Sequence, residues 1–151
     1  MVTDDQVQEK VEIFKANCHK SGLKVTPQRI AIYEELIKTD DHPSAEMLCR
    51  KVRKRMPNIS LDTVNRTLLT FSEFGAAFIV PGSGDVRRFD GGMEDHQHFR
   101  CIKCKRIIDF HHEPFDTIET PDGISEEFTI LKKTVYFEGI CNFCVEKQED
   151  Q

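Results

Sequence analysis

The chain has 151 residues, a length that fits one ordinary domain or two small ones. Hydrophobic residues make up 38% and charged residues 31%, a balance that excludes a disordered or fibrous chain. No run approaches the roughly 18 apolar residues of a membrane span, and the acidic N-terminal segment is unlike a secretion signal. We therefore expect a cytoplasmic protein with no membrane segment.

The net charge of −5 is unevenly distributed. Residues 1–92 carry 14 basic against 13 acidic side chains, and residues 93–151 carry 7 against 13. Between Arg50 and Arg66, six basic residues accompany one acid, Asp62. A local basic patch can attract nucleic acid even on an acidic protein. The other interpretation is a solvated helix face, which charge alone favours.

The first half predicts four helices in series. Apolar residues recur at helical spacing over residues 7–14, 30–37, 45–56 and 61–71. Thr26, Ser44 and Ser60 are typical of helix starts, and Thr26 is followed by a proline that suits the first turn. Pro57 and Gly75 are expected to end the third and fourth helices.

Helices three and four predict a helix-turn-helix, because only Pro57–Ser60 separates them. Two β-like runs follow, at residues 78–80 and 86–89, around the turn formers of residues 81–85. Helices followed by a hairpin give a winged helix, whose wing would place Arg87 and Arg88 near phosphates. Many helical proteins contain such pieces without touching DNA, so this pattern alone does not establish DNA binding.

The second half predicts a small β-rich domain after a glycine hinge at Asp90–Gly92. We expect strands at residues 98–101, 107–110 and 128–137. A short helix within residues 111–119 would be ended by Pro121–Gly123. The predicted boundaries are therefore 1–90 for the first domain, 91–98 for the hinge and 99–151 for the second domain.

Two CxxC pairs, Cys101/Cys104 and Cys141/Cys144, carry the strongest chemical signal. Four thiolates on two tight turns are typical of a closed, tetrahedral structural Zn²⁺ site. A thioredoxin-like redox motif would show one CxxC in a βαβ pattern, which is absent here. Such a zinc site contributes on the order of 10 kcal/mol to folding but names no function.

A second constellation combines imidazoles with carboxylates: Asp90, His96, His98, Asp109 and, far upstream, His42. His96 and His98 would leave an extended strand on one face. A mixed nitrogen and oxygen set suits Fe²⁺ or Mn²⁺ better than a sulfur site does, although Zn²⁺ can also enter. Taken singly, each histidine is better explained as an exposed or core residue, and sequence order does not show that the five meet.

The chain resembles the ferric uptake regulator family of bacterial metal-dependent repressors along nearly its whole length. The matching segments are Thr26–Arg29, His42–Ala45, Pro57–Ser60 with Thr63-Val64, Arg88–Asp90, His96–Cys101, Cys104, Ile107–Asp109 and the Cys141/Cys144 pair. The resemblance implies an α+β fold. An N-terminal winged helix-turn-helix domain, binding double-stranded operator DNA, would be joined to a small C-terminal α/β dimerisation domain that holds the four-cysteine zinc site. The chain would act as a homodimer.

Carried over residue by residue, the family's regulatory ligands fall on His42, Asp90, His96, His98 and Asp109. Asp at both carboxylate positions resembles the peroxide-sensing branch, since iron-uptake members tend to have Glu and zinc sensors a Cys at position 90. In that branch, bound Fe²⁺ reacts with H₂O₂ and a ligand histidine is oxidised, which here implies His42 and His96.

Several residues depart from the family pattern. Asn65 stands where a tyrosine often precedes the recognition-helix arginine, and Lys105 replaces a glycine after the first CxxC. A histidine that some members use for a third metal site is replaced near Lys132-Lys133, so we do not predict that site. Pro121–Gly123 is expected to shorten the dimerisation helix.

The expected function is a metal-dependent repressor, with Zn²⁺ structural and Fe²⁺ or Mn²⁺ regulatory. Arg66 would read a base or phosphate, Lys24 and Arg29 would contact the DNA backbone, and Thr63 and Asn65 are weaker candidates for base contacts. The first alternative is an iron-uptake or manganese regulator without self-oxidation. A metal-dependent enzyme is a distant alternative, because no deaminase signature is present.

Overall fold

The computed structural model describes residues 2–39, 41–80, 86–91, 96–130 and 133–149. These residues form two compact units, Met1–Met93 and Glu94–Gln151. The division falls inside the segment expected as a hinge, of which residues 92–95 lie outside the described part. The last two residues of that expected hinge, Gln97 and His98, are already in a strand. No helix in the described ranges is long and apolar enough to cross a bilayer.

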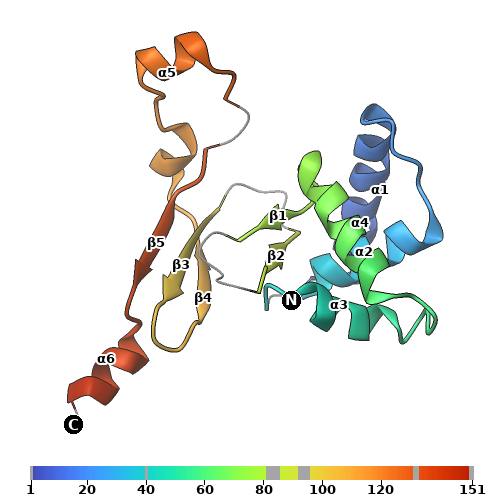
Figure 1. The fold of residues 1–151 in the computed structure, drawn as a ribbon, viewed down its shortest axis with the longest axis horizontal. Helices are drawn as coiled ribbons and strands as arrows, with labels where there is room; N and C mark the ends of the chain where they lie inside the picture. The colour runs from blue at the N-terminus through green and yellow to red at the C-terminus, as the bar shows by residue number, and fades with distance from the viewer. Residues whose placement is uncertain (1, 40, 81–85, 92–95, 131–132, 150–151) are drawn as a thin grey trace. The chain divides into compact units, whose positions relative to one another are not determined.

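The N-terminal unit contains four helices and one short hairpin (Figure 1). Its elements are α1 (Asp4–Lys20), α2 (Pro27–Lys38), α3 (Ala45–Val52), α4 (Leu61–Glu73), β1 (Phe78–Ile79) and β2 (Phe89–Asp90). The two strands pair antiparallel, with Phe78 opposite Asp90. The hairpin confirms the first expected wing strand in shortened form, but the second lies at Phe89–Asp90 and not over residues 86–89. The turn expected at residues 81–85 is outside the described residues.

Helix starts follow the predicted caps. The hydroxyls of Thr26, Ser44 and Ser60 each accept a hydrogen bond from the backbone N–H three residues later. Each cap satisfies a donor that the first helical turn leaves without an intrahelical partner. Gly75 follows α4 at φ 85°, a left-handed conformation that glycine adopts without steric cost.

Replacing the Ser60 cap tests this account of the helix start. Ser60→Ala is expected to lower the free energy of unfolding by about 1 kcal/mol, because the Thr63 N–H loses its 3.0 Å bond to Ser60 Oγ. Ser72→Ala is the matched control, since Ser72 Oγ only donates back to the Leu69 carbonyl within the same helix. Urea unfolding followed by circular dichroism measures both. Equal losses in the two variants would contradict the capping role.

An aromatic cluster forms the centre of the N-terminal core. The rings of Phe14 and Tyr33 stack with centroids 4.1 Å apart, and Phe71 meets Phe14 edge-on at 5.0 Å. These three residues come from α1, α2 and α4, so the core fixes the three helices against one another. The predicted stripe of α4 is confirmed at Val64, Leu68 and Phe71, but Leu61 is 44% exposed.

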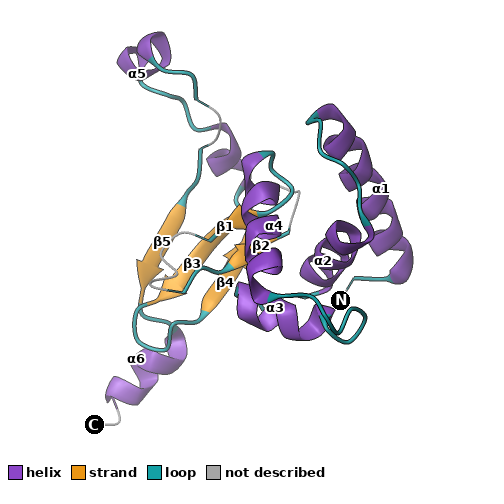
Figure 2. Ribbon diagram, turned by 45° about the vertical axis from the view of Figure 1, so that its right-hand side comes forward, coloured by secondary structure: helices purple, strands orange, loops and turns teal. Residues whose placement is uncertain are grey.

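The C-terminal unit is built on a three-stranded sheet of order β4-β3-β5 (Figure 2). Its elements are β3 (Gln97–Cys101), β4 (Ile107–Phe110), the 3₁₀ helix η1 (Glu113–Thr117), α5 (Asp122–Glu127), β5 (Tyr136–Gly139) and α6 (Asn142–Glu149). β3 pairs antiparallel with β4 and parallel with β5. In Figure 1, α5 and α6 lie beyond opposite ends of β5.

Among the remaining boundaries, three expectations are wrong and one is met by a 3₁₀ helix. The third helix ends at Val52, and the backbone continues only as turns to Met56, whose N–H donates to the Val52 carbonyl. The short helix expected within residues 111–119 is met by the 3₁₀ helix η1. Pro121–Gly123 begins α5 instead of ending a helix, since proline suits the position before a helix. Of the expected strand at 128–137, the described structure retains only the start of β5.

Candidate metal centres and nucleic-acid interface

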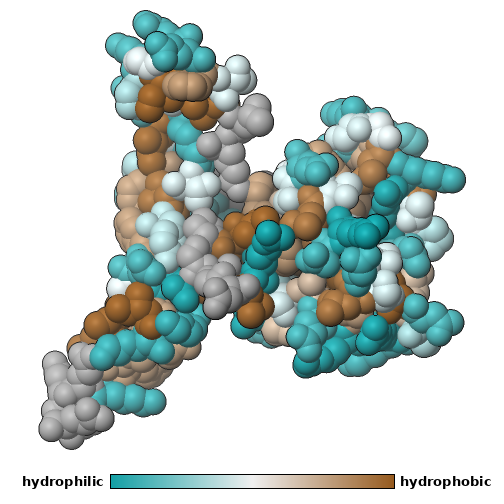
Figure 3. All heavy atoms as spheres, in the orientation of Figure 1, coloured by the Kyte–Doolittle hydropathy of each residue, from teal (hydrophilic) through white to brown (hydrophobic). Residues whose placement is uncertain are grey.

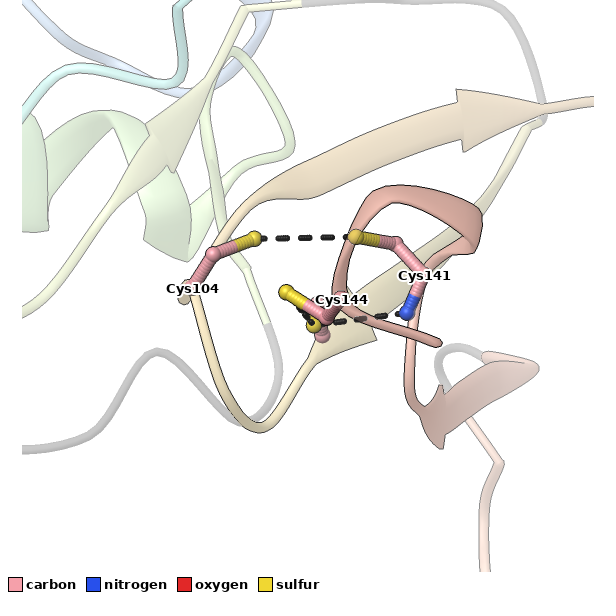
Figure 4. A group of neighbouring side chains, drawn as sticks. Cys104, Cys141 and Cys144 are labelled. Carbon is pink, nitrogen blue, oxygen red and sulfur yellow. Dashed lines mark hydrogen bonds between the residues drawn. The ribbon is translucent and has the colours of Figure 1, made fainter. Parts of the chain in front are cut away.

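The four predicted zinc ligands come together in the C-terminal unit. Cys101 ends β3, Cys104 lies in the turn before β4, and Cys141 and Cys144 lie at the start of α6. Figure 4 shows Cys104, Cys141 and Cys144 directing their sulfurs toward a shared space from two separate chain segments. The close approach arises because β3 pairs with β5, which brings Cys101 opposite Gly139.

The sulfur–sulfur distances fit a tetrahedral ion. Cys101 Sγ lies 3.7 Å from Cys144 Sγ, and Cys104 Sγ lies 3.8 Å from Cys141 Sγ. Sulfurs about 2.3 Å from a central Zn²⁺ are separated by about 3.8 Å at a tetrahedral angle. A disulfide would need about 2.05 Å, so the four cysteines are free thiols arranged as a ligand set.

Electrostatics also favours a cation at this cluster. Hydrogen bonds from the backbone N–H groups of Cys141 and Cys104 lower the pKa of Cys101 to about 6. Burial, together with the neighbouring sulfurs, raises the pKa of Cys144 to about 12. Cys101 therefore loses its proton readily, whereas Cys144 resists becoming a second thiolate in the same cluster. A divalent ion among the sulfurs would remove that resistance, so the donor set fits Zn²⁺.

The turn that carries Cys104 is held in a conformation usually reserved for glycine. Lys105, the residue found in place of the expected glycine, has φ 68°. Its backbone N–H donates to the Cys101 carbonyl at 3.0 Å, and its Nζ donates to the Ile102 carbonyl at 2.8 Å. These bonds offset the steric cost of a lysine in the left-handed backbone conformation and hold the turn that carries Cys104 in place.

The other predicted ligands form two groups, one in each unit. In the N-terminal unit, His42 Nε2 lies 3.6 Å from Asp90 Oδ2, and both side chains are largely buried. His42 has φ 50°, a costly conformation for a histidine. The Phe89 N–H donates to the Pro43 carbonyl at 2.9 Å, which holds the histidine loop beside β2. We refer to these two residues as the His42–Asp90 pair.

In the C-terminal unit, His96, His98 and Asp109 form a second group. His98 Nε2 lies 3.2 Å from both His96 Nε2 and Asp109 Oδ1, and His96 Nε2 lies 4.0 Å from the same oxygen. Antiparallel pairing of β3 with β4 sets His98 directly opposite Asp109. Ligand atoms about 2.1 Å from one ion are separated by about 3.0–3.4 Å, so the two 3.2 Å separations fit a shared ion, whereas the 4.0 Å between His96 and Asp109 is wider. We refer to these residues as the His96–His98–Asp109 cluster.

A hydrogen-bonded network lies beside this cluster, between β3 and η1. The sequence predicts no third metal site in the C-terminal unit. Asp116 accepts from Gln97 Nε2 at 3.0 Å and contacts His111 Nε2 at 2.7 Å. The hydrogen bond from His111 is the main reason that the pKa of Asp116 is lowered. Gln97 Oε1 in turn accepts from the backbone of His112, so the network ties η1 to β3. Lys133 Nζ donates to the Ile118 carbonyl instead of serving as a ligand.

The residues predicted to contact DNA lie in the N-terminal unit and differ in their exposure and in their hydrogen bonds. Arg66 is exposed on α4, and Asn65 is half-buried next to it. The Thr63 hydroxyl lies 2.8 Å from Ser60 Oγ in the helix cap. Lys24 is exposed, but Arg29 Nη1 donates to the Lys24 carbonyl and braces the loop between α1 and α2.

Much of the basic patch is internally compensated, which sequence reading missed. Arg50 pairs with Glu46, and Arg55 pairs with Glu34 at 2.6 Å. On the wing, Arg88 is half-buried and donates to the His42 carbonyl, so it braces the histidine loop, while its expected place near phosphates stays a prediction. The i,i+4 spacing of Glu46 with Arg50, and of Asp62 with Arg66, is the signal in the sequence that could have revealed such pairing.

Comparison with known proteins adds a family match and close similarities. The sequence profile of the ferric uptake regulator family matches residues 20–138. Over 143 residues, the chain is 30% identical to the peroxide operon regulator of Bacillus subtilis, covering 95% of this chain and 96% of that protein. It is 29% identical to the peroxide-responsive repressor PerR of Staphylococcus epidermidis, covering 95% of each.

Solved structures share the fold. The ferric uptake regulator Fur of Helicobacter pylori superposes with a TM-score of 0.69 at 21% identity, covering 92% of this chain and 93% of that one. A zinc uptake regulator in complex with zinc and DNA superposes with a TM-score of 0.62 at 20% identity, covering 95% and 97%. These similarities confirm the expected α+β architecture.

Proposed function

Because the chain belongs to the ferric uptake regulator family, we propose that it is a metal-dependent, DNA-binding transcriptional repressor. The observation that carries this proposal is the division of nitrogen and oxygen ligands between the two units. The His42–Asp90 pair sits beside the wing, and the His96–His98–Asp109 cluster sits on the C-terminal sheet. One ion shared by both groups would couple the DNA-reading unit to the other unit.

The donor chemistry supports Fe²⁺ or Mn²⁺ as this regulatory ion. Three imidazoles and two carboxylates form a harder set than the four thiolates, so the two centres would hold different metals. The role of His42, Asp90, His96, His98 and Asp109 is to bind the ion in one relative arrangement of the units. Such an ion switches DNA affinity only if that arrangement is the one that binds DNA better. Cys101, Cys104, Cys141 and Cys144 would hold structural Zn²⁺.

The protein would act as a homodimer through its C-terminal unit. Within the described residues, the buried core of this unit consists of Cys101, Cys141 and Cys144, with Phe99 packed against them. Large hydrophobic side chains are exposed instead, as Figure 3 shows. They include Ile124, Phe128, Phe137, Ile140, Phe143 and Val145. Apolar surface of this kind is typical of a face that a second copy covers.

DNA recognition would use α4, the second helix of the helix-turn-helix. Arg66, Asn65 and Thr63 lie in its first two turns, the part of a recognition helix that contacts base edges. A dimer would present two such helices to successive major grooves, about 34 Å apart. Lys24 and Arg29 would contact the DNA backbone. This function assigns the protein to the cytoplasm as a regulator, not an enzyme.

Selection from a pool of random duplexes tests the repressor function. The zinc-containing dimer, with and without added Mn²⁺, is incubated with a pool carrying a 24-base-pair random core. We expect Mn²⁺ to enrich a palindromic sequence and to strengthen its binding at least about tenfold. Identical binding with and without Mn²⁺ would contradict the regulatory role of the ion.

We further propose that the protein senses peroxide, as the two relatives described above are named for doing. When bound, Fe²⁺ would activate H₂O₂ by lending an electron that it regains when the ring is oxidised. One oxygen atom of H₂O₂ would be inserted into a ring C–H of His42 or His96, which supplies the two electrons, and the other oxygen would leave as water. The modified imidazole is a poorer ligand, so the ion and the DNA would be released.

Peptide mass spectrometry distinguishes peroxide sensing from the alternative. After the Fe²⁺ form reacts with H₂O₂, we expect a gain of one oxygen atom on the His42 or His96 peptide, and none in the Mn²⁺ form. An unmodified Fe²⁺ form that keeps its metal-dependent DNA binding would instead identify an iron-uptake or manganese regulator.

A further inference from the structure

Arg66 is held by a carboxylate on the exposed side of α4. Its Nε lies 3.0 Å from Asp62 Oδ2, one helical turn earlier, and the two side chains are 79% and 68% exposed. The acid precedes the arginine, which is the more favourable order for an i,i+4 pair. An exposed pair of this kind contributes little to stability, so stability alone gives little reason for it.

The geometry of the pair limits which donors of Arg66 remain for DNA. A guanidinium has five N–H donors in a rigid fork, and Asp62 engages the one on Nε. The two terminal amino groups stay available at the end of the side chain. They match the O6 and N7 acceptors that guanine presents in the major groove.

The surroundings of Asp62 favour contact with a base over contact with a phosphate. Asp62 and Asn65 line a hollow of about 590 Å³ together with Glu46 of α3 and Arg87 of the wing segment. A carboxylate at this place repels phosphate oxygens and lowers the net charge that Arg66 offers to a DNA backbone. Arg66 therefore gains little from non-specific contact and depends on a base edge.

We propose that Asp62 is a positioning residue that makes Arg66 a guanine reader and thereby sets the base preference of this protein. The inference rests on the proposed DNA-binding function and adds the base that is read and the residue that enforces it. It predicts one dominant guanine in each half-site, at the position that faces Arg66. A bidentate contact of this kind discriminates against other bases by about 10-fold to 100-fold.

Parallel selections with Mn²⁺-loaded full-length dimers test the role of Asp62. Random duplex pools are selected with the wild type, Asp62→Ala, Asp62→Asn and Glu46→Ala. The last variant is the matched control, because Glu46 also lies in a first helical turn and pairs with an arginine four residues on, Arg50, at 3.0 Å. Affinity is then measured for the wild-type consensus, and for duplexes with adenine or 7-deazaguanine at the selected guanine.

We expect the wild type to lose about tenfold in affinity with either substituted duplex. Asp62→Ala should lose about twofold of that discrimination, the share that an exposed pair can set, while binding unrelated DNA more tightly, because it gains net positive charge. Asp62→Asn should retain part of the discrimination, since its amide oxygen still accepts from Arg66 Nε. Glu46→Ala should match Asp62→Ala in the charge effect but keep the guanine preference.

Two results would overturn the inference while leaving the repressor function standing. One is a wild-type consensus without a dominant guanine in each half-site. The other is an Asp62→Ala variant with unchanged discrimination against adenine and 7-deazaguanine. A wild type that enriches no sequence at all would overturn the DNA-binding function itself, and the role of Asp62 with it. Thermal unfolding of each variant verifies that the compared proteins are folded.

Discussion

Replacing Cys101 with serine is expected to remove the bound zinc and unfold the C-terminal unit. Cys101 is fully buried, receives the Cys141 N–H on its sulfur, and lies 3.7 Å from Cys144 Sγ. Serine is a poor zinc ligand, and the unit has little other core to compensate. The variant should be a zinc-free monomer that retains the helical signal of the N-terminal unit.

Zinc analysis, sedimentation and circular dichroism measure this outcome together. Cys49→Ala is the matched control, because Cys49 is buried in the N-terminal core and is not part of the sulfur cluster. That variant should keep one zinc ion per chain and remain dimeric, with a modest loss of stability. A dimeric Cys101→Ser protein with full zinc content would show that the four sulfurs are not the zinc site.

Replacing His98 with alanine is expected to abolish the response of DNA binding to Mn²⁺ or Fe²⁺. His98 is central to its cluster, since its Nε2 lies 3.2 Å from both His96 and Asp109. Loss of one ligand should weaken the affinity for the regulatory ion by at least about 100-fold. Even residues that only hydrogen-bond to a metal ligand account for about 10-fold to 100-fold in affinity. Without a bound ion, nothing favours the arrangement that binds DNA.

This variant should keep its zinc, because the sulfur cluster uses none of the same residues. His19→Ala is the control, as His19 is an exposed residue in the last turn of α1. Titration of Mn²⁺ into each zinc-loaded dimer measures metal binding, and a gel shift on the selected duplex then measures metal-stimulated DNA binding. Full stimulation of His98→Ala by Mn²⁺ would contradict the proposed regulatory site.

Local signals predicted the helical unit well, because its elements are determined within a few residues. Ser and Thr caps located the starts of α2, α3 and α4, and Gly75 marked the end of α4. Local signals failed where contacts between distant residues decide the structure. The start of β5 is set by its pairing with β3, and α6 begins inside a CxxC motif, where a metal turn was expected.

The same contrast between local signals and contacts of distant residues holds for the candidate sites. Two CxxC motifs predicted the sulfur cluster, because each motif already aims two sulfurs at one point. Nothing in the spacing of His98 and Asp109 shows that they face each other, since that depends on the register of β3 and β4. The Asp62–Arg66 pair was within reach of sequence analysis, as both lie four residues apart on a predicted helix.

The pairing of β3 with β5 also bears on how the protein is made. Helices α1 to α4 are built from neighbouring residues, so the N-terminal unit can fold while the rest of the chain is still being synthesised. The sheet cannot close until residues 136–139 leave the ribosome, and the sulfur cluster is incomplete before Cys144 does. Zinc loading is therefore a late event in the life of the nascent chain. A cell short of zinc would accumulate chains in which the N-terminal unit is folded and the C-terminal unit is not.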